Sequence, residues 1–175
     1  ELVRRTVRDF AEQKVAPVAE ELDREHRFPY ELVAELAELG LMGMPIPDEY
    51  GGGGGDTLSY AIAIEELTRI DSSVAITVAA HTSLGTMPIF LFGSEEQKQA
   101  WLPDLASGKK LAAFGLTETG AGSDAAASRT RGCSSSGSGA VRASRAGSVV
   151  RWASSSPESS SAGSATVISS MLLSP

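Results

Sequence analysis

The acidic residues of this 175-residue chain stop almost completely after Ala127. Residues 1–127 hold 21 of the 22 Asp and Glu, whereas residues 128–175 hold one acid (Glu158), no Lys, five Arg and 17 Ser. A segment of that composition buries too little apolar surface to offset its conformational entropy. The pattern therefore predicts a folded region up to about residue 127, followed by a disordered Ser/Gly/Arg-rich tail over 128–175.

The overall charge and the cysteine count exclude some partners and sites. With 22 acidic and 15 basic residues the chain has a formal charge of −7, which argues against nucleic acid, because phosphate binding requires clustered Lys and Arg. The single cysteine, Cys133, excludes an internal disulfide framework and a cysteine-based zinc cage, and no metal site is expected. The chain begins at Glu1 inside a helical pattern without an apolar leader, so we expect a fragment of a cytoplasmic protein.

Residues 1–108 predict an all-α domain. Apolar residues recur at spacings of three and four over 1–25, which indicates one helix that Pro17 can kink. Pro29 begins a second helix and Gly40 ends it. The predicted buried stripe of this second helix is Leu32, Val33, Leu36 and Leu39. Three further helices are expected over 56–70 with an Asp56 cap, over 74–93 with a Ser72 or Ser73 cap, and up to Leu105 with a capping box that begins at Ser94.

Three features of this domain allow both a functional and a structural interpretation. Glycines 51–55 offer N–H groups to a phosphate, but no apolar strand precedes them and no Gly-Lys-Ser/Thr follows, so a flexible turn is favoured. Glu65 and Glu66 are adjacent on a helix and project about 100° apart, so we expect solvated or subunit-facing side chains rather than a carboxylate pair. His81 lies alone on an apolar element and is interpreted as a satisfied core or interface histidine.

The stretch 74–93 contains no charged residue and is long enough to raise the question of a membrane span. It also contains Thr, Ser, His and Pro, and Asp71 rather than Lys or Arg stands near its start. We therefore expect the buried central helix of a soluble bundle, and no membrane partner.

After Lys110 the apolar pattern changes from helical to continuous. Residues 111–116 are short, apolar and unbroken, as in a strand, and they lead into Thr-Glu-Thr-Gly-Ala-Gly-Ser-Asp over 117–124. Small residues let a ligand approach the backbone, and the hydroxyls of Thr117 and Ser123 with consecutive N–H groups suit carbonyl or phosphate oxygens. From the residues alone, a polar ligand loop and a plain glycine-rich connection both remain open.

Several segments resemble the acyl-CoA dehydrogenase family. The most specific is 115–127, Gly-Leu-Thr-Glu-Thr-Gly-Ala-Gly-Ser-Asp-Ala-Ala-Ala, and the segments 40–52, 94–98 and 102–108 are also similar to family sequences. The resemblance covers 1–127. It implies a mainly α fold, with an N-terminal helical domain over 1–108 and the opening strand and flavin loop of a truncated β-barrel domain over 109–127.

The resemblance also implies a flavin site. FAD would lie against the strand and loop, with backbone N–H groups near Leu116 and Thr117 on the pyrimidine-side oxygens and the Thr117 hydroxyl near the flavin edge. Gly122 and Ser123 would lie near the pyrophosphate, and Ser123 also near the CoA thioester of the substrate. The residues implied to bind the cofactor are Phe114, Gly115, Leu116, Thr117, Glu118, Thr119, Gly120, Ala121, Gly122 and Ser123.

The reaction that the resemblance implies is the α,β-dehydrogenation of an acyl-CoA thioester to a 2-enoyl-CoA, as in fatty-acid or branched-chain amino-acid breakdown. Electrons would pass to an electron-transfer flavoprotein, and full-length members would form a homotetramer. The catalytic Glu of the family comes from a C-terminal domain that this chain lacks, so no catalytic residue is assigned. We therefore expect the chain to be inactive alone and to hold no stoichiometric FAD.

The chain departs from the family pattern in two places. Thr119 stands where many relatives have Pro, and the similarity ends after Ala127. Trp152 lies near the position of a second flavin-contacting stretch, but its surroundings do not match and it receives no role. One hypothesis for the abrupt end is a slip of the reading frame just after Ala127, which translation of the neighbouring frames would test. The alternative function is a non-catalytic helical interaction module with a disordered tail.

Overall fold

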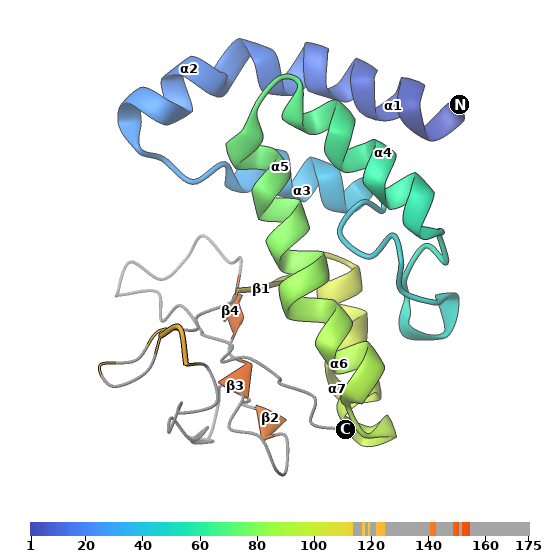
Figure 1. Ribbon diagram of the computed structural model, residues 1–175. Coiled ribbons are helices and arrows are strands. Elements are labelled where there is room, and N and C mark those ends of the chain that lie inside the picture. The colour runs from blue at the N-terminus through green and yellow to red at the C-terminus, as the bar shows by residue number, and fades with distance from the viewer. Residues whose placement is uncertain are drawn as a thin grey trace.

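The computed structural model describes residues 1–113, 117, 119, 122–124, 141–142, 149–150 and 152–154. Its N-terminal segments α1 (Leu2–Phe10), η1 (Ala11–Val15) and α2 (Ala16–Glu25) follow one another without a break, as one long rod along the top of the molecule (Figure 1). The middle segment is a π-helical turn that lies directly before Pro17. Proline has no N–H to donate to the preceding turn, and such turns are where helices absorb that loss.

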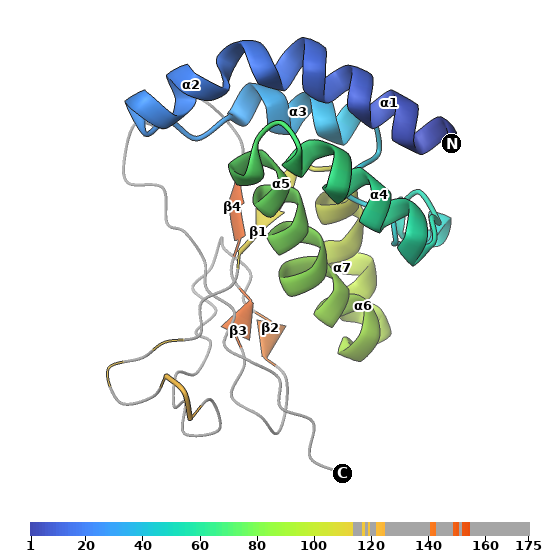
Figure 2. The ribbon, with the colours of Figure 1, turned by 45° about the horizontal axis from the view of Figure 1, so that its top comes forward.

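Helix α3 (Tyr30–Glu38) lies beneath this rod (Figure 2). It begins after Pro29 and is followed by Gly40 at φ +74°, as the sequence predicts. The prediction that Leu39 is buried is wrong, because 44% of its surface is exposed. The helix ends at Glu38, so the backbone of Leu39 already turns toward Gly40 and leaves the stripe.

The five glycines form an ordered turn that follows a 3₁₀ segment, η2 (Asp48–Tyr50). The N–H groups of Gly53, Gly54 and Gly55 donate to the carbonyls of residues 43, 46 and 44 at 3.0, 2.8 and 2.7 Å. Those of the other two glycines donate to residues 48 and 47. Because all five donors are already used, the run does not offer a phosphate cradle, and the structural interpretation is the correct one.

Two aspartates begin the next helices. Asp56 caps α4 (Thr57–Thr68) by accepting from the Ser59 N–H at 2.7 Å, as predicted. Helix α5 (Ser72–Ala79) is capped by Asp71, whose carboxylate accepts from the N–H groups of Ser73 and Val74 at 2.6 and 3.1 Å. The prediction of a Ser72 or Ser73 cap is therefore wrong by one residue or two.

Replacing Asp71 by alanine is expected to lower the free energy of unfolding by about 1 kcal/mol, because two N–H groups of the first turn lose their acceptor. Ser72→Ala, on the neighbouring residue, is the matched control and is expected to change it by less than about 0.5 kcal/mol. Urea denaturation followed by circular dichroism measures both. Equal effects of the two substitutions would contradict the assignment of the cap.

Helix α5 continues through the π-helical turn η3 (Ala80–Thr86) into α6 (Met87–Phe92). By length and composition the segment Ser72–Phe92 is apolar enough to cross a membrane. It also contacts α4, α7 and strand β1 and buries the polar side chains of His81, Thr82 and Thr86. That packing favours the core-helix interpretation, while Ile76, Leu84 and Leu91 on the same segment remain exposed.

Helix α7 (Glu95–Ala106) begins with the predicted capping box of Ser94 and Gln97. It lies beside α6 in both views (Figures 1 and 2). A bond of 2.8 Å from the Tyr50 hydroxyl to the Glu95 carboxylate ties its first turn to η2. After the helix, Gly108 at φ +69° turns the chain toward the sheet.

Strand β1 (Lys110–Ala112) opens the β part, shorter than the predicted run 111–116, of which 114–116 lie outside the described residues. It pairs antiparallel with β4 (Trp152–Ser154), with Ala112 opposite Trp152. A second pair joins β2 (Val141–Arg142) and β3 (Val149–Val150). These three strands interrupt the predicted tail, whose other residues lie outside the described part, as does Cys133.

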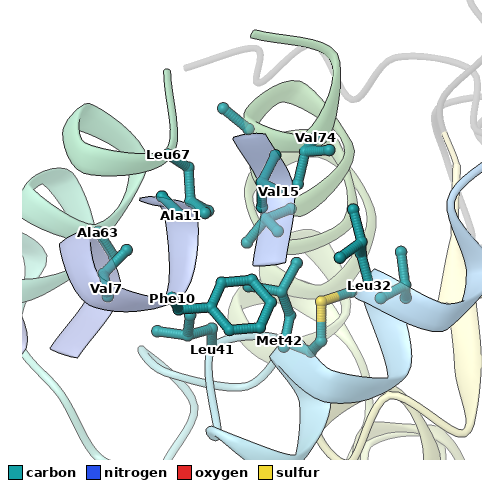
Figure 3. Close-up of a cluster of buried hydrophobic side chains, with 14 of the residues drawn as sticks. Val7, Phe10, Ala11, Val15, Leu32, Leu41, Met42, Ala63, Leu67 and Val74 are labelled. Atoms are coloured by element: carbon teal, nitrogen blue, oxygen red, sulfur yellow. The ribbon is translucent and has the colours of Figure 1, made fainter. Parts of the chain in front are cut away.

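Two clusters of buried side chains form the core. The larger one joins the N-terminal rod to α3, α4 and α5, and Figure 3 shows Val7, Phe10, Ala11 and Val15 pointing into it toward Leu67 and Met42. The smaller one holds α6, α7 and β1 together through Ile46, Tyr50, Ile89, Leu102, Leu105, Ala106 and Ala112. Strand β1 is therefore packed on the helical domain at its last residue, just before the predicted ligand loop.

Candidate functional site

The structure describes four of the ten predicted site residues. Thr117, Thr119 and Ser123 are exposed, and Gly122 is half-buried. The other six predicted residues, Phe114, Gly115, Leu116, Glu118, Gly120 and Ala121, lie outside the described part of the chain. For the predicted loop, the structure thus shows that the described hydroxyl side chains after strand β1 are exposed.

The two ends of this loop approach each other at Thr117 and Gly122. A Cβ built on Gly122 would lie 3.8 Å from the Thr117 methyl group, an ordinary contact, and within 4 Å it would meet no other atom of the described residues. Packing among the described residues therefore does not require glycine at this position. The hydroxyl-bearing side chains of Thr117, Thr119 and Ser123, by contrast, are exposed.

Strand β1, which precedes the predicted loop in the chain, is held on the helical domain by His81. The imidazole is 1% exposed. Its Nδ1 accepts from the Ala112 N–H at 3.0 Å, and its Nε2 lies 3.1 Å from the Leu105 carbonyl oxygen. An N–H donor on one side and a carbonyl on the other require the neutral tautomer with the proton on Nε2. The prediction of a satisfied core histidine is confirmed.

Burial lowers the pKa of His81 from 6.5 to about 4, and the bond to Leu105 opposes that shift. In the unfolded chain His81 is therefore protonated below about pH 6.5, whereas in the folded chain it stays neutral down to about pH 4. As the pH falls through this window, the free energy of unfolding is expected to decrease, by up to about 1.4 kcal/mol per pH unit. Above pH 6.5 the contribution is absent, because both states are neutral.

The His81→Gln variant isolates this effect, since subtracting its pH profile from that of the parent chain removes the other titrating groups. Urea denaturation at several pH values between about 7 and 4.5 gives both profiles. The parent chain is expected to lose more stability than the variant across the window. Parallel profiles would show that the imidazole is not neutral and buried as the structure has it.

Glu66 is a second buried polar group, and here the expectation of a solvated side chain is wrong. Its side chain is 0% exposed. Arg8 donates to both carboxylate oxygens at 2.9 Å, Arg69 donates at 2.9 Å, and Arg4 donates as well. Glu65 lies at the exposed edge of this cluster: its side chain is 57% exposed and accepts from Arg4 at 3.1 Å. The two adjacent acids therefore have different roles, and neither forms a carboxylate pair with the other.

The bonds from Arg8, with those from Arg69 and Arg4, lower the pKa of Glu66 to about 2, against the opposing effect of desolvation. A carboxylate that weakly basic, with both oxygens already engaged, is unsuited to remove a proton from a substrate. Glu66 is a structural group that ties α1 to α4. Among the described residues no group of three His, Cys, Asp or Glu is placed to hold a metal ion.

Residues 1–109 match the family model "Acyl-CoA dehydrogenase, N-terminal domain". The chain belongs to the acyl-CoA dehydrogenase family. It is 48% identical over 129 residues to an acyl-CoA dehydrogenase of Bacillus subtilis, a match that covers 74% of this chain and 34% of that protein.

Two solved structures of acyl-CoA dehydrogenases resemble the chain in three dimensions. Butyryl-CoA dehydrogenase of Megasphaera elsdenii has a TM-score of 0.68 and 45% identity, covering 73% of this chain and 34% of that one. An acyl-CoA dehydrogenase of Bacillus anthracis complexed with FAD has a TM-score of 0.66 and 46% identity, covering 70% and 21%. The chain spans about a third of the length of the curated relatives that it matches.

Proposed function

We propose that this chain supplies the helical domain and the flavin loop of an FAD-dependent acyl-CoA dehydrogenase. The loop after β1 carries the proposal, because it presents the exposed hydroxyls of Thr117, Thr119 and Ser123 beside Gly122. The relative from Bacillus anthracis holds FAD. The match with the Bacillus subtilis protein extends over 129 residues, which is longer than the helical domain itself.

The residues of the loop receive separate parts of the ligand in this proposal. The Thr117 hydroxyl and the backbone N–H groups near it bind the polar edge of the flavin ring, where hydrogen bonds favour uptake of negative charge. Gly122 and Ser123 approach the pyrophosphate, and Ser123 also the thioester of the substrate. When bound, FAD supplies the two-electron acceptor for removal of the β hydrogen as hydride, while a carboxylate takes the α proton.

That carboxylate is proposed to come from outside this chain, since Glu66 is unsuited to the role. The chain alone is therefore expected to be inactive and to hold less than one FAD. The substrate is proposed to be an acyl-CoA, the electron acceptor an electron-transfer flavoprotein, and the complete enzyme a tetramer in the cytoplasm.

A fusion tests the proposal. Residues 1–127 of this chain are joined to the remaining part of the Bacillus subtilis relative, and the purified fusion is mixed with butyryl-CoA under anaerobic conditions. Loss of the visible absorbance of oxidised flavin, with formation of the enoyl product, is the expected result. The unmodified relative serves as the positive control. A fusion that binds FAD but is reduced by none of a series of acyl-CoA thioesters would contradict the proposed reaction, and a fusion that folds without FAD would favour the helical interaction module.

A further inference from the structure

The π-helical turn η3 meets strand β1 at two residues. His81 and Gly85 are four residues apart, and both meet Ala112: the imidazole accepts its N–H, and a Cβ on Gly85 would overlap its methyl group. The Thr86 hydroxyl donates to the His81 carbonyl oxygen at 2.9 Å. π-helical turns within α-helices are often found at functional sites.

His81 bridges two elements that follow each other in the chain, helix α7 and strand β1. On one side it contacts the Leu105 carbonyl in the last turn of α7, and on the other it accepts from Ala112 in β1. Between these two residues the chain makes a corner at Gly108, where a Cβ would overlap the side chain of Ala37. The imidazole thus contacts the residues before and after this corner, Leu105 and Ala112.

An apolar side chain of the same size would fill this space but would not replace these bonds. The buried Ala112 N–H would lose its acceptor, and a buried donor without an acceptor is costly. The Leu105 carbonyl would keep its bond from the Gly108 N–H, at 3.0 Å. Strand β1 pairs with β4 along one edge. The histidine provides the acceptor on its other edge, which faces the helical domain.

We propose that His81 is the positioning residue of strand β1: its neutral imidazole fixes the strand on η3 and α7, and so sets where the chain leaves the helical domain after Ala112. Thr117 follows Ala112 by only five residues, so we expect a displaced strand to displace Thr117 as well. The identity of the ligand rests on the proposed function above. The docking of the strand does not, because every contact used here is within the chain.

Hydrogen exchange of the Ala112 amide in the full 175-residue chain tests the docking. His81→Leu fills the space without a hydrogen-bond acceptor and is expected to increase exchange at Ala112 at least tenfold. His81→Asn, whose side-chain oxygen can take the place of Nδ1, is expected to restore most of the protection, whereas His81→Gln, whose amide reaches the place of Nε2, restores less. The amide of Leu36, in the larger core cluster, reports global stability and is expected to change little in the Asn variant.

The backbone ¹H–¹⁵N signals of Thr117 and Gly122 test the positioning. They are expected to shift with His81→Leu and to return toward the parent values with His81→Asn. Shifts at Ala112 without any at Thr117 and Gly122 would overturn the positioning role, as would equal exchange at Ala112 in the Leu and Asn variants. These measurements need no flavin, so a fusion protein that fails to react with acyl-CoA would refute the proposed function without affecting this result.

Discussion

Replacing Glu66 by alanine is expected to lower the melting temperature of the chain by on the order of 10 °C. The substitution leaves the guanidinium groups of Arg4, Arg8 and Arg69 against one another with no shared anion. Removing one partner of a buried ionic cluster is far more harmful than removing an exposed one, because the remaining charges stay partly desolvated. Thermal unfolding followed by circular dichroism measures the effect.

The neighbouring acid provides a matched control. Glu65→Ala removes the same charge from the next residue of the same helix, but breaks only an exposed contact with Arg4, so its effect is expected to be below about 2 °C. Glu66→Gln keeps the volume and loses the charge, and is expected to fall between the two. Equal melting temperatures for Glu65→Ala and Glu66→Ala would show that the arginine cluster contributes nothing.

Gly85→Ala is expected to lower the free energy of unfolding by about 2–3 kcal/mol. The new methyl group would overlap the methyl group of Ala112, so strand β1 or the turn η3 has to move. Gly85 and Ala112 lie where η3 and β1 pack against each other. Close packing there leaves little room for either backbone to shift. Urea denaturation gives the change, and the exchange of the Ala112 amide shows whether the strand has separated from the turn.

A compensating substitution distinguishes this clash from a general loss of helix stability. Ala112→Gly removes the methyl group that Gly85→Ala would meet, so the double variant is expected to recover at least half of the loss. The coupling energy between the two sites should then be about 1 kcal/mol or more. Additive effects of the two substitutions would contradict direct contact between them.

The sequence predicts most of the helices because their limits are local. The caps at Asp56 and Ser94 lie within three residues of the groups that they bind, and Gly40 ends α3 through its own backbone conformation. The sequence does not single out the Asp71 cap, because Asp71, Ser72 and Ser73 are all residue types that can cap a helix. In the structure the Asp71 carboxylate accepts from two N–H groups. Leu39 was misplaced because a periodic pattern does not show where the helix stops.

The role of Glu66 could not be predicted from local sequence, because two of its partners, Arg4 and Arg8, lie about sixty residues away. One signal was available. Glu66 follows Ala63 by three residues and precedes Leu67, both buried, so it lies on the inward side of α4, and the spacing of Arg4 and Arg8 places two cations on one face of α1. His81 was correctly interpreted as satisfied, but its partners depend on the corner at Gly108, which only the fold brings into reach.

The candidate site, too, is predicted only in part from the sequence. The sequence identifies the loop by its residues, and the structure describes how its strand is docked and how the ends of the loop approach at Thr117 and Gly122. The ligand contacts that we propose for it involve residues outside the described part of the chain, and no local pattern in the sequence gives their geometry.

The affinity of the fusion protein for FAD, measured with Gly122→Ala in the loop, tests most directly whether this loop lies against the cofactor. Without a ligand the added methyl group meets only an ordinary contact with Thr117 among the described residues, so the melting temperature of the flavin-free protein should not change. With a ligand at the backbone it has no room, and the dissociation constant for FAD is expected to rise at least tenfold. An unchanged dissociation constant would show that the flavin does not lie against these residues.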